Sequence, residues 1–386
     1  MFPEKLQQKL EIRNAENALR QLGSENQLID FSSNDYLGFA KNEAIFNDSH
    51  NFLRAQNMLQ NGATGSRLLS GNHKLYPLVE KQLAQFHNSE SALIFNSGYD
   101  ANLGFFASLP QRGDVILYDA YIHASIRDGM AMNHAKSYKF RHNNVADLEK
   151  LLKRHSQPDT TNSAEKPSIY VVTESVFSMD GDTPDLKAIA ELCDQYQAFF
   201  VVDEAHALGV FGNQGCGLIQ ELDLETAVFA RIVTFGKALG CHGAAILGSE
   251  KLKQYLVNFS RSLIYTTALS PHSLASIHAG YQALKTTESR KALNANIQFF
   301  QLEIIKNELE HLFIASASAI QCCVVSGNDR VKSMSANLQN KGFDVKAILS
   351  PTVSKGQERL RFCLHAYNSE AEISEVLNLL AKTLKS

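Results

Sequence analysis

Lys237 lies in the stretch TFGKALGCHGAA, residues 234–245, where glycine and alanine surround it. A lysine that serves only as a surface charge needs no such setting. A lysine that attacks a carbonyl does, because its amine has to be held close to one carbon atom. The free amine has a pKa of about 10.4 and is mostly protonated at neutral pH. A resting imine with an aldehyde removes that obstacle, so the stretch predicts a Schiff-base lysine.

Other reactive side chains follow short apolar runs of the sequence. Asp203 lies in the last positions of AFFVVDE, and His206 comes three residues later. Thr234 lies near the end of RIVTF, and His123 follows DVILYDAYI. The run SALIF is followed by NSGYDAN, and SIYVVTE is followed by SVFSMDGD, which contains Ser178. If these runs are strands, their polar residues stand at the ends where open α/β sheets bind ligands.

Each of these features also has a simpler explanation. An acid at a strand end is commonly a helix cap, a single histidine is more often structural, and NSGY is common turn chemistry. Their joint placement at successive strand ends favours one shared site. Pyridoxal 5'-phosphate (PLP) needs such a set: an amine for its aldehyde, a helix N-terminus for its phosphate and a carboxylate for its pyridine nitrogen. Lys237, the segment 97–99 and Asp203 would supply them, so the sequence predicts PLP as cofactor.

The elements that position these residues alternate between about residues 91 and 248. Short β-branched runs alternate with amphipathic stretches such as DLKAIAELCDQY, which predicts a parallel sheet covered by helices on both faces. After about residue 270, longer helical stretches lead to short strands and a last helix with a capping box at Ser369 and Glu372. We expect an N-terminal helix and strand segment at 1–45, a large PLP-binding domain at 46–270 and a smaller α/β domain at 271–386.

Composition limits the partners of the 386-residue chain. A net charge of −3 and a pI near 6.5 argue against a nucleic acid or an anionic membrane held by bulk charge. The six cysteines form no C-x-x-C pair and the 13 histidines no H-E-x-x-H, so we expect reduced thiols and no metal. Residues 1–23 lack the apolar core of a signal peptide, and no run reaches the length of a membrane span. A cytoplasmic protein is expected, with an exposed loop at 156–167.

The sequence resembles the α-oxoamine synthases, a family of fold-type I PLP enzymes. The resemblance covers nearly the whole chain and rests on the motifs FSSNDYLG, GATGSRLLSG, FNSGYDANLG, HAS, VVTESVFSMDGD, VVDEAHALGVFG, TFGKALG, LIYTTALSP and RLRF. It implies a large, doubly wound, mostly parallel sheet domain and a smaller C-terminal α/β domain.

The resemblance also implies roles for single residues at the cofactor. Lys237 would be the Schiff-base lysine and the base that removes the α-proton of an amino acid. Asp203 would pair with the pyridine nitrogen, His206 would bind the phenolic oxygen and His123 would stack on the ring. Further cofactor contacts would come from Gly98, Tyr99, Ser178 and Thr234.

Substrate contacts and a second subunit follow from the same resemblance. Arg361 corresponds to the arginine that binds the substrate carboxylate, and Arg20 and Thr352 fall where the family binds substrate. Thr266 and Thr267 match a segment that reaches the phosphate of the neighbouring subunit, so the resemblance implies a homodimer with its sites at the interface. The alternative is that these threonines cap the helix that starts near Pro271.

The implied reaction is a decarboxylating condensation of an amino acid with an acyl thioester. The motifs TFGK and FSSNDYLG favour L-alanine and a pimeloyl thioester, on CoA or an acyl carrier protein, in biotin biosynthesis. Glycine C-acetyltransferase, 5-aminolevulinate synthase and serine palmitoyltransferase are the alternatives within the family. A regulatory protein that kept the fold but lost catalysis would need a DNA-binding segment and would not need Lys237.

Overall fold

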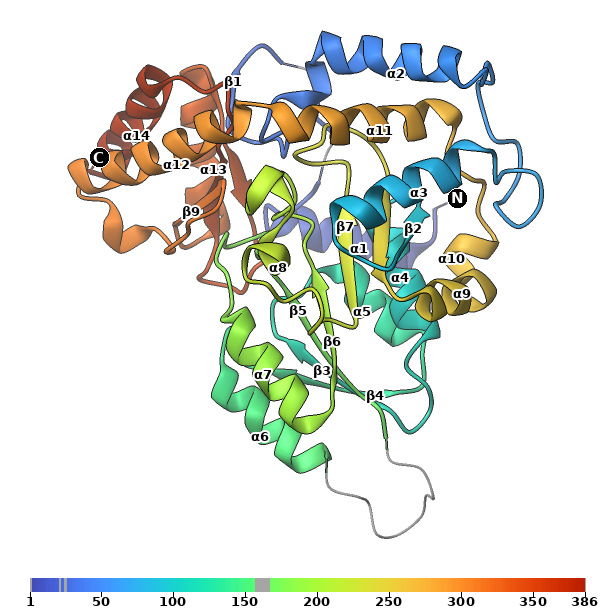
Figure 1. Cartoon of the computed structure of the whole chain (residues 1–386). Helices are drawn as coiled ribbons and strands as arrows, with labels where there is room; N and C mark the ends of the chain where they lie inside the picture. The colour runs from blue at the N-terminus through green and yellow to red at the C-terminus, as the bar shows by residue number, and fades with distance from the viewer. Residues whose placement is uncertain (1, 21, 24–25, 157–166, 386) are drawn as a thin grey trace. The chain divides into compact units, whose positions relative to one another are not determined.

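A computed structural model describes residues 2–20, 22–23, 26–156 and 167–385. Most of the loop expected at 156–167 lies outside the described residues. The chain forms two compact units (Figure 1). The smaller unit comprises residues 1–36, 178–182 and 291–386, and the larger one comprises 37–177 and 183–290. The two units are described separately below.

The larger unit is built on a seven-stranded sheet with the strand order β2-β8-β7-β6-β5-β3-β4. Its central pairs β7–β6, β6–β5, β5–β3 and β3–β4 are parallel, whereas β8 runs antiparallel to both of its neighbours. The strands are β2 (Ser91–Phe95), β3 (Val115–Asp119), β4 (Lys136–Phe140), β5 (Ile169–Glu174), β6 (Phe199–Asp203), β7 (Ala230–Thr234) and β8 (Ala244–Gly248). The predicted doubly wound, mostly parallel sheet is therefore confirmed.

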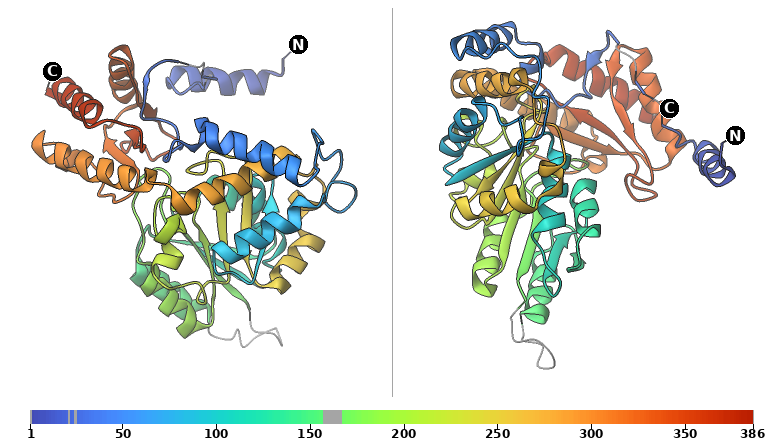
Figure 2. Two further views of the ribbon diagram at one scale, coloured as in Figure 1. Left: turned by 45° about the horizontal axis from the view of Figure 1, so that its top comes forward. Right: turned by 90° about the vertical axis from the view of Figure 1, so that its right-hand side faces the viewer.

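Successive residues of these strands pack into cores on opposite faces of the sheet. Val201 belongs to one core with residues of α4 (Gly98–Ser108), α5 (Ala124–Ala131) and α9 (Glu250–Phe259). Its neighbours Phe200 and Val202 belong to the other core, with residues of α6 (Val145–His155) and α7 (Leu186–Tyr196). This is why the strands read as continuous apolar runs, because both faces are buried. Figure 2 shows helices on both sides of this sheet.

From β2 to β7, the helices of the larger unit alternate with its strands. They are η1 (Phe39–Lys41), α2 (Glu43–Ala55), α3 (Leu75–Phe86), α4 (Gly98–Ser108), α5 (Ala124–Ala131), α6 (Val145–His155), α7 (Leu186–Tyr196), η2 (Asn213–Gly215), α8 (Leu218–Glu221), α9 (Glu250–Phe259), α10 (Arg261–Ile264) and α11 (Pro271–Thr286). Helix α11 contacts α2 and α3, which places it in this unit. Ser270 caps its first turn by accepting from the Ser273 amide.

The smaller unit holds a three-stranded antiparallel sheet of order β11-β12-β9 and a parallel pair, β1 and β10. The strands are β1 (Ile29–Asp30), β9 (Ile320–Val324), β10 (Phe343–Asp344), β11 (Lys346–Ile348) and β12 (Arg359–Cys363). The helices are α1 (Glu4–Ala15), α12 (Ser289–Lys306, which begins at the unit boundary), η3 (Glu310–Leu312), α13 (Asn328–Asn340) and α14 (Glu370–Lys385).

The predicted capping box opens α14 as expected. The Ser369 amide donates to Glu372 at 2.7 Å, and the Glu372 amide donates to the Ser369 hydroxyl at 3.3 Å. Ile373, Val376 and Leu377 of this helix are fully buried. In the described part of the chain, no helix combines the length and the apolar character needed to span a bilayer.

Candidate active site

The carboxyl ends of parallel strands bring several of the predicted residues of the larger unit to one edge of its sheet. Asp203 and Thr234 are the last residues of the neighbouring strands β6 and β7. His123 follows β3 and occupies the N-cap of α5. Gly98 opens α4 directly after β2. The sequence thus predicted this convergence from residues more than 100 positions apart.

Lys237 lies in the turn between β7 and β8. The Phe235 amide donates to the Gly243 carbonyl at 2.9 Å, and the Cys241 amide donates to the Phe235 carbonyl at 2.8 Å. Gly240 has a φ of +59°, and a side chain there would collide with the backbone of Ala40. These constraints hold the turn in one shape and present the half-buried Lys237 from a fixed backbone.

The start of α4 has the geometry of an anion-binding nest. Ser97 caps the helix by accepting from the Asp100 amide at 3.0 Å, and the first helical bond runs from Ala101 to the Ser97 carbonyl. The amides of Gly98 and Tyr99 precede that bond and point out of the helix end, where the helix dipole favours an anion. A side-chain carbon on Gly98 would lie 3.5 Å from the Thr234 hydroxyl oxygen, an ordinary contact distance, so the start of α4 and Thr234 face the same space.

Asp203 is buried, with 6% of its surface exposed, and is held by two donors. The Ala205 amide donates to its Oδ1 at 2.9 Å, and the Asn102 side chain donates to its Oδ2 at 2.8 Å. This leaves a fixed carboxylate that can pair with a cation. Asn102 was not identified from the sequence. The sequence does carry a signal for Asn102, because it is a polar residue, four positions after Gly98, on the otherwise apolar buried face of a helix.

Glu174 is a second carboxyl group beside Asp203 that sequence reasoning missed. It ends β5 and is paired in register with Asp203 of β6. Only 3% of its surface is exposed, and its Oε1 has no hydrogen-bond partner among the described residues. Burial, with the nearby charge of Asp203, raises the pKa of Glu174 to about 8. The same signal that identified Asp203, an acid at the end of an apolar run, was present at this position.

The two histidines predicted in the site both lie in the larger unit. His206 is buried. The side chain of His123 retains exposed surface, yet the protein around its ring lowers the pKa of the imidazole, because it removes water from the charged form. The charge of Asp203 opposes this effect and that of Lys237 adds to it. Lys237 also acts on the Glu174 carboxyl, so its charge lies near both His123 and Glu174.

A buried ion pair underlies this edge of the sheet. Glu204 follows Asp203 directly, and its carboxylate accepts from Nε of Arg231 at 2.9 Å and from Nη2. The same guanidinium donates to the carbonyls of His87 and Cys216 at 3.2 and 3.0 Å. Both side chains are excluded from water, and the pair ties the residue that follows β6 to the second residue of β7.

The segment of Thr266 and Thr267 lies close to the nest. The Asn96 side chain donates to the Thr266 hydroxyl at 3.1 Å and to the Thr267 carbonyl at 2.8 Å. Asn96 immediately precedes the nest residue Ser97. Since Ser270 caps α11, the alternative of a capping role for the threonines is not supported.

The predicted substrate residues lie in the smaller unit and form two groups there. Arg20 donates from Nη2 to the hydroxyl of Thr352 at 3.3 Å. Arg361 is buried and donates from Nε to the Ser178 carbonyl at 2.8 Å and from Nη2 to Asn34 at 3.0 Å. The orientation of this guanidinium is therefore set by the protein. Ser178 contributes its backbone carbonyl to this arrangement.

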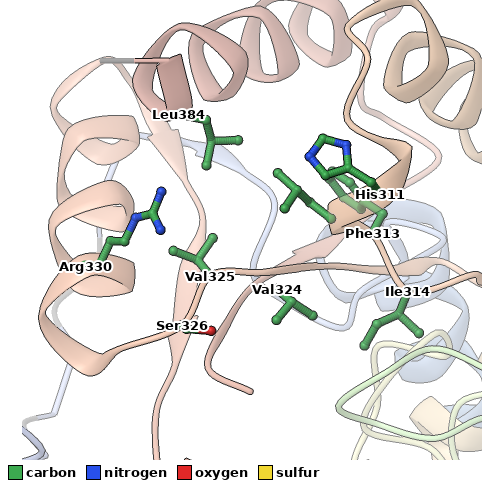
Figure 3. Close-up of a pocket in the computed structure, with 9 residues that line it drawn as sticks. His311, Phe313, Ile314, Val324, Val325, Ser326, Arg330 and Leu384 are labelled. Atoms are coloured by element: carbon green, nitrogen blue, oxygen red, sulfur yellow. The ribbon is translucent and has the colours of Figure 1, made fainter. Parts of the chain in front are cut away.

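A separate cavity of about 420 Å³ opens in the smaller unit (Figure 3). Apolar residues line most of it, with Arg330 on one side and His311 on the other. None of the residues predicted for the site belongs to its lining.

The larger unit fits PLP on several independent points. The nest at α4 and the Thr234 hydroxyl suit a phosphate, the buried Asp203 carboxylate suits a protonated ring nitrogen, and the constrained Lys237 suits an aldehyde. The larger unit thus offers hydrogen-bond donors for the phosphate, a carboxylate for the ring nitrogen and an amine for the aldehyde.

Comparisons with known proteins agree with this geometry. The aminotransferase class I and II family matches residues 26–380. The 8-amino-7-oxononanoate synthase of Emericella nidulans is 40% identical and covers 92% of this chain and 89% of its own length.

Solved structures are similar over the same span. The 8-amino-7-oxononanoate synthase of Francisella tularensis is 28% identical, with a TM-score of 0.76 over 94% of this chain and 99% of its own. A Sphingomonas wittichii serine palmitoyltransferase is 27% identical, with a TM-score of 0.85 over 93% of this chain and 87% of its own. The chain therefore belongs to the aminotransferase class I and II family of PLP-dependent enzymes and has the fold-type I architecture.

Proposed function

We propose that this chain is an acyltransferase that condenses L-alanine with a pimeloyl thioester and releases CO2, free thiol and 8-amino-7-oxononanoate. The main support is the similarity to 8-amino-7-oxononanoate synthases at 40% identity over 92% of the chain. The set of Lys237, Asp203 and the α4 nest supports the cofactor that this reaction needs. The product is a precursor in biotin biosynthesis.

Lys237 is the group that moves the proton in this proposal. PLP, when bound, supplies an electron sink that stabilises negative charge at the substrate carbon next to the amino group. The Lys237 amine takes the proton from that carbon, and the rigid turn between β7 and β8 holds it near the carbon. After CO2 has left, the same amine can return a proton to the carbon.

Asp203 holds a proton on the pyridine nitrogen by pairing with it. Its burial strengthens that attraction, and the bonds from Asn102 and Ala205 fix its orientation. The α4 nest and Thr234 would hold the phosphate, and His123 would contact the ring. These residues and Asp203 would thus hold the cofactor at both ends.

Arg361 binds the carboxylate of the amino acid. Its guanidinium is already oriented by Ser178 and Asn34, so binding costs little side-chain entropy. A carboxylate held in this way turns the Cα–H bond toward the direction in which the proton can leave. Arg20 and Thr352, which contact each other, are assigned to the acyl substrate.

We infer that the active form is a homodimer in which Thr266 and Thr267 reach the phosphate of the partner subunit. Exposed apolar side chains gather on the same loops, with Tyr265 73% exposed and Leu69 84% exposed. The Ala268 amide donates to the Gly65 carbonyl, so these two loops lie side by side. A second copy of the chain would cover this apolar surface.

The function is tested with PLP-loaded protein and pairs of substrates. The protein is incubated with L-alanine, glycine or L-serine, each with pimeloyl, acetyl or palmitoyl thioesters on CoA and, for pimeloyl, on acyl carrier protein. Products are identified by mass spectrometry, and CO2 release from carboxyl-labelled amino acid is counted. We expect 8-amino-7-oxononanoate from L-alanine and the pimeloyl thioester.

Three outcomes would contradict the proposal in different ways. Faster turnover of glycine with acetyl-CoA would identify a glycine C-acetyltransferase. Turnover of serine with palmitoyl-CoA would agree with the high TM-score to serine palmitoyltransferase. Turnover with no pair would refute the acyltransferase assignment itself.

A further inference from the structure

A continuous line of hydrogen bonds joins Asp203 to His123 through two buried side chains. Asn102 donates from Nδ2 to Oδ2 of Asp203 at 2.8 Å and to the Ser125 hydroxyl at 3.1 Å. The Ser125 hydroxyl lies 2.7 Å from Nδ1 of His123. Asn102 and Ser125 are 2% and 0% exposed, so the two bonds from Asn102 are protected from water, whereas the bond between Ser125 and His123 is partly buried. Neither residue has a role in the function proposed above beyond holding Asp203.

The direction of each hydrogen bond follows from the carboxylate at one end. An ionised carboxylate offers acceptors only, so Asn102 must turn its amide nitrogen toward Asp203. The second hydrogen on that nitrogen then points to the Ser125 oxygen, which accepts it. The single hydroxyl hydrogen of Ser125 is left for Nδ1 of His123.

A second donor meets the same ring nitrogen. The Ser125 backbone amide donates to Nδ1 at 3.3 Å, which makes His123 the N-cap of helix α5. Two donors thus converge on Nδ1, and a nitrogen that accepts carries no proton. The ring proton of the neutral imidazole must therefore sit on Nε2.

We propose that Asn102 and Ser125 are positioning residues that keep His123 neutral, with its proton on Nε2, and tie its orientation to the carboxylate of Asp203. Protonation of Nδ1 would replace two favourable bonds by a contact between a proton and two donors. The positive end of the α5 dipole adds to the cost of an imidazolium at that place.

This arrangement has a use at the site. The proposed function places His123 over a pyridine ring that Asp203 keeps positively charged. An imidazolium there would repel that ring, whereas a neutral imidazole stacks on it. Asp203 thus has two effects. It keeps the pyridine ring positively charged directly, and through Asn102 and Ser125 it keeps the His123 imidazole neutral. Only this use depends on the proposed function; the tautomer is a property of the chain alone.

Other charged groups act on His123 and enter the same balance. Asp203 and Asp128 raise the pKa of His123, whereas loss of water around the ring, Lys237 and Arg127 lower it. The experiment therefore replaces Asn102 or Ser125, which carry the hydrogen bonds, and leaves the charged residues around His123 unchanged.

The experiment measures the histidine nitrogens of the apoprotein by NMR after ¹⁵N-histidine labelling. A His123→Gln variant identifies the signals of His123. In the wild type we expect an unprotonated Nδ1 and a protonated Nε2. Ser125→Ala and Asn102→Ala should each populate the other tautomer and raise the pKa of His123, by about one unit for Ser125→Ala, which loses one neutral hydrogen bond. Ser125→Thr, which keeps the hydroxyl, should restore the wild-type signals.

Ser108→Ala is the matched control, because Ser108 lies on α4 like Asn102 but its hydroxyl donates only to backbone carbonyls of its own helix. A wild-type ring with its proton on Nδ1 would overturn the proposal, even if every variant failed to fold. Folded Ser125→Ala and Asn102→Ala variants with signals like those of Ser108→Ala would also overturn it. Failure of the proposed function would instead appear as absence of PLP binding or turnover with the NMR result intact.

Discussion

Replacing Glu174 by glutamine should change how the stability of the apoprotein depends on pH. Glutamine has nearly the same shape but does not ionise. In the folded chain, burial and the neighbouring Asp203 raise the pKa of Glu174 to about 8, from an ordinary value of 4.5. In the unfolded chain the carboxyl titrates near its ordinary value.

The sign follows from which state releases its proton first. Below pH 4.5 both states hold the proton and Glu174 costs nothing. Between pH 4.5 and about 8 the unfolded chain ionises while the folded chain does not, so the folded state loses stability as pH rises. The interval of about 3.5 pKa units corresponds to a ceiling of about 5 kcal/mol, at 1.36 kcal/mol per unit. Glu174→Gln removes this loss.

The measurement is urea unfolding of the apoprotein at several pH values between about 5 and 8.5. The difference in unfolding free energy between Glu174→Gln and the wild type should grow with pH, by about 4 kcal/mol between pH 5 and pH 8. Glu191→Gln is the control, because Glu191 is exposed on α7 of the same unit. A difference that stays constant over this range would refute the assignment of a protonated acid at Glu174.

Further predictions concern the cofactor, the subunits and the core. Lys237→Ala should abolish condensation and prevent borohydride from fixing PLP to the protein; peptide mapping that finds PLP on another lysine of the wild type would exclude this role. Asp203→Asn should bind PLP weakly and lose exchange of the α-proton of alanine, followed by NMR in D2O; unchanged exchange would speak against it. A mixture of Lys237→Ala chains with chains altered at Thr266 and Thr267 should regain activity if the threonines act across the dimer. If the mixture stays inactive although subunit exchange is proven, the threonines do not act across the dimer. Arg231→Ala leaves a buried carboxylate unpaired and should lower the unfolding free energy by about 3–5 kcal/mol, measured by urea denaturation.

The sheet of the larger unit was largely predictable because its signals are local. Strands buried on both faces read as apolar runs, and SALIF, AFFVVDE and AAILG all mark strands of the sheet. Strand β4 was missed, since its sequence KSYKF is mostly exposed and polar at the edge of the sheet. The reversed direction of β8 was also not predictable from the run AAILG, because direction depends on the pairing of strands and not on composition.

The site shows the same division between local and distant signals. Lys237, Asp203 and Thr234 could be predicted because each stands next to a strand signal, and the resemblance to a known family supplied the roles of the others. Asn102 and Ser125 could not be found in this way. Their importance depends on hydrogen bonds to residues far away in the chain, and such contacts leave no pattern in the sequence around them.

The reversed strand β8 also determines when the site can first exist during synthesis. Strand β2 lies at the edge of the sheet, and within the described structure its partner there is β8. Helix α4 follows β2 directly. It contacts β7 as well as β8, but the strand from which it starts gains its partner in the sheet only when residues 244–248 have left the ribosome. A growing chain that ends before β8 therefore carries every residue of the nest and the lysine itself without a place to hold the cofactor. The cofactor can stabilise only the completed larger unit, as a ligand of the folded state.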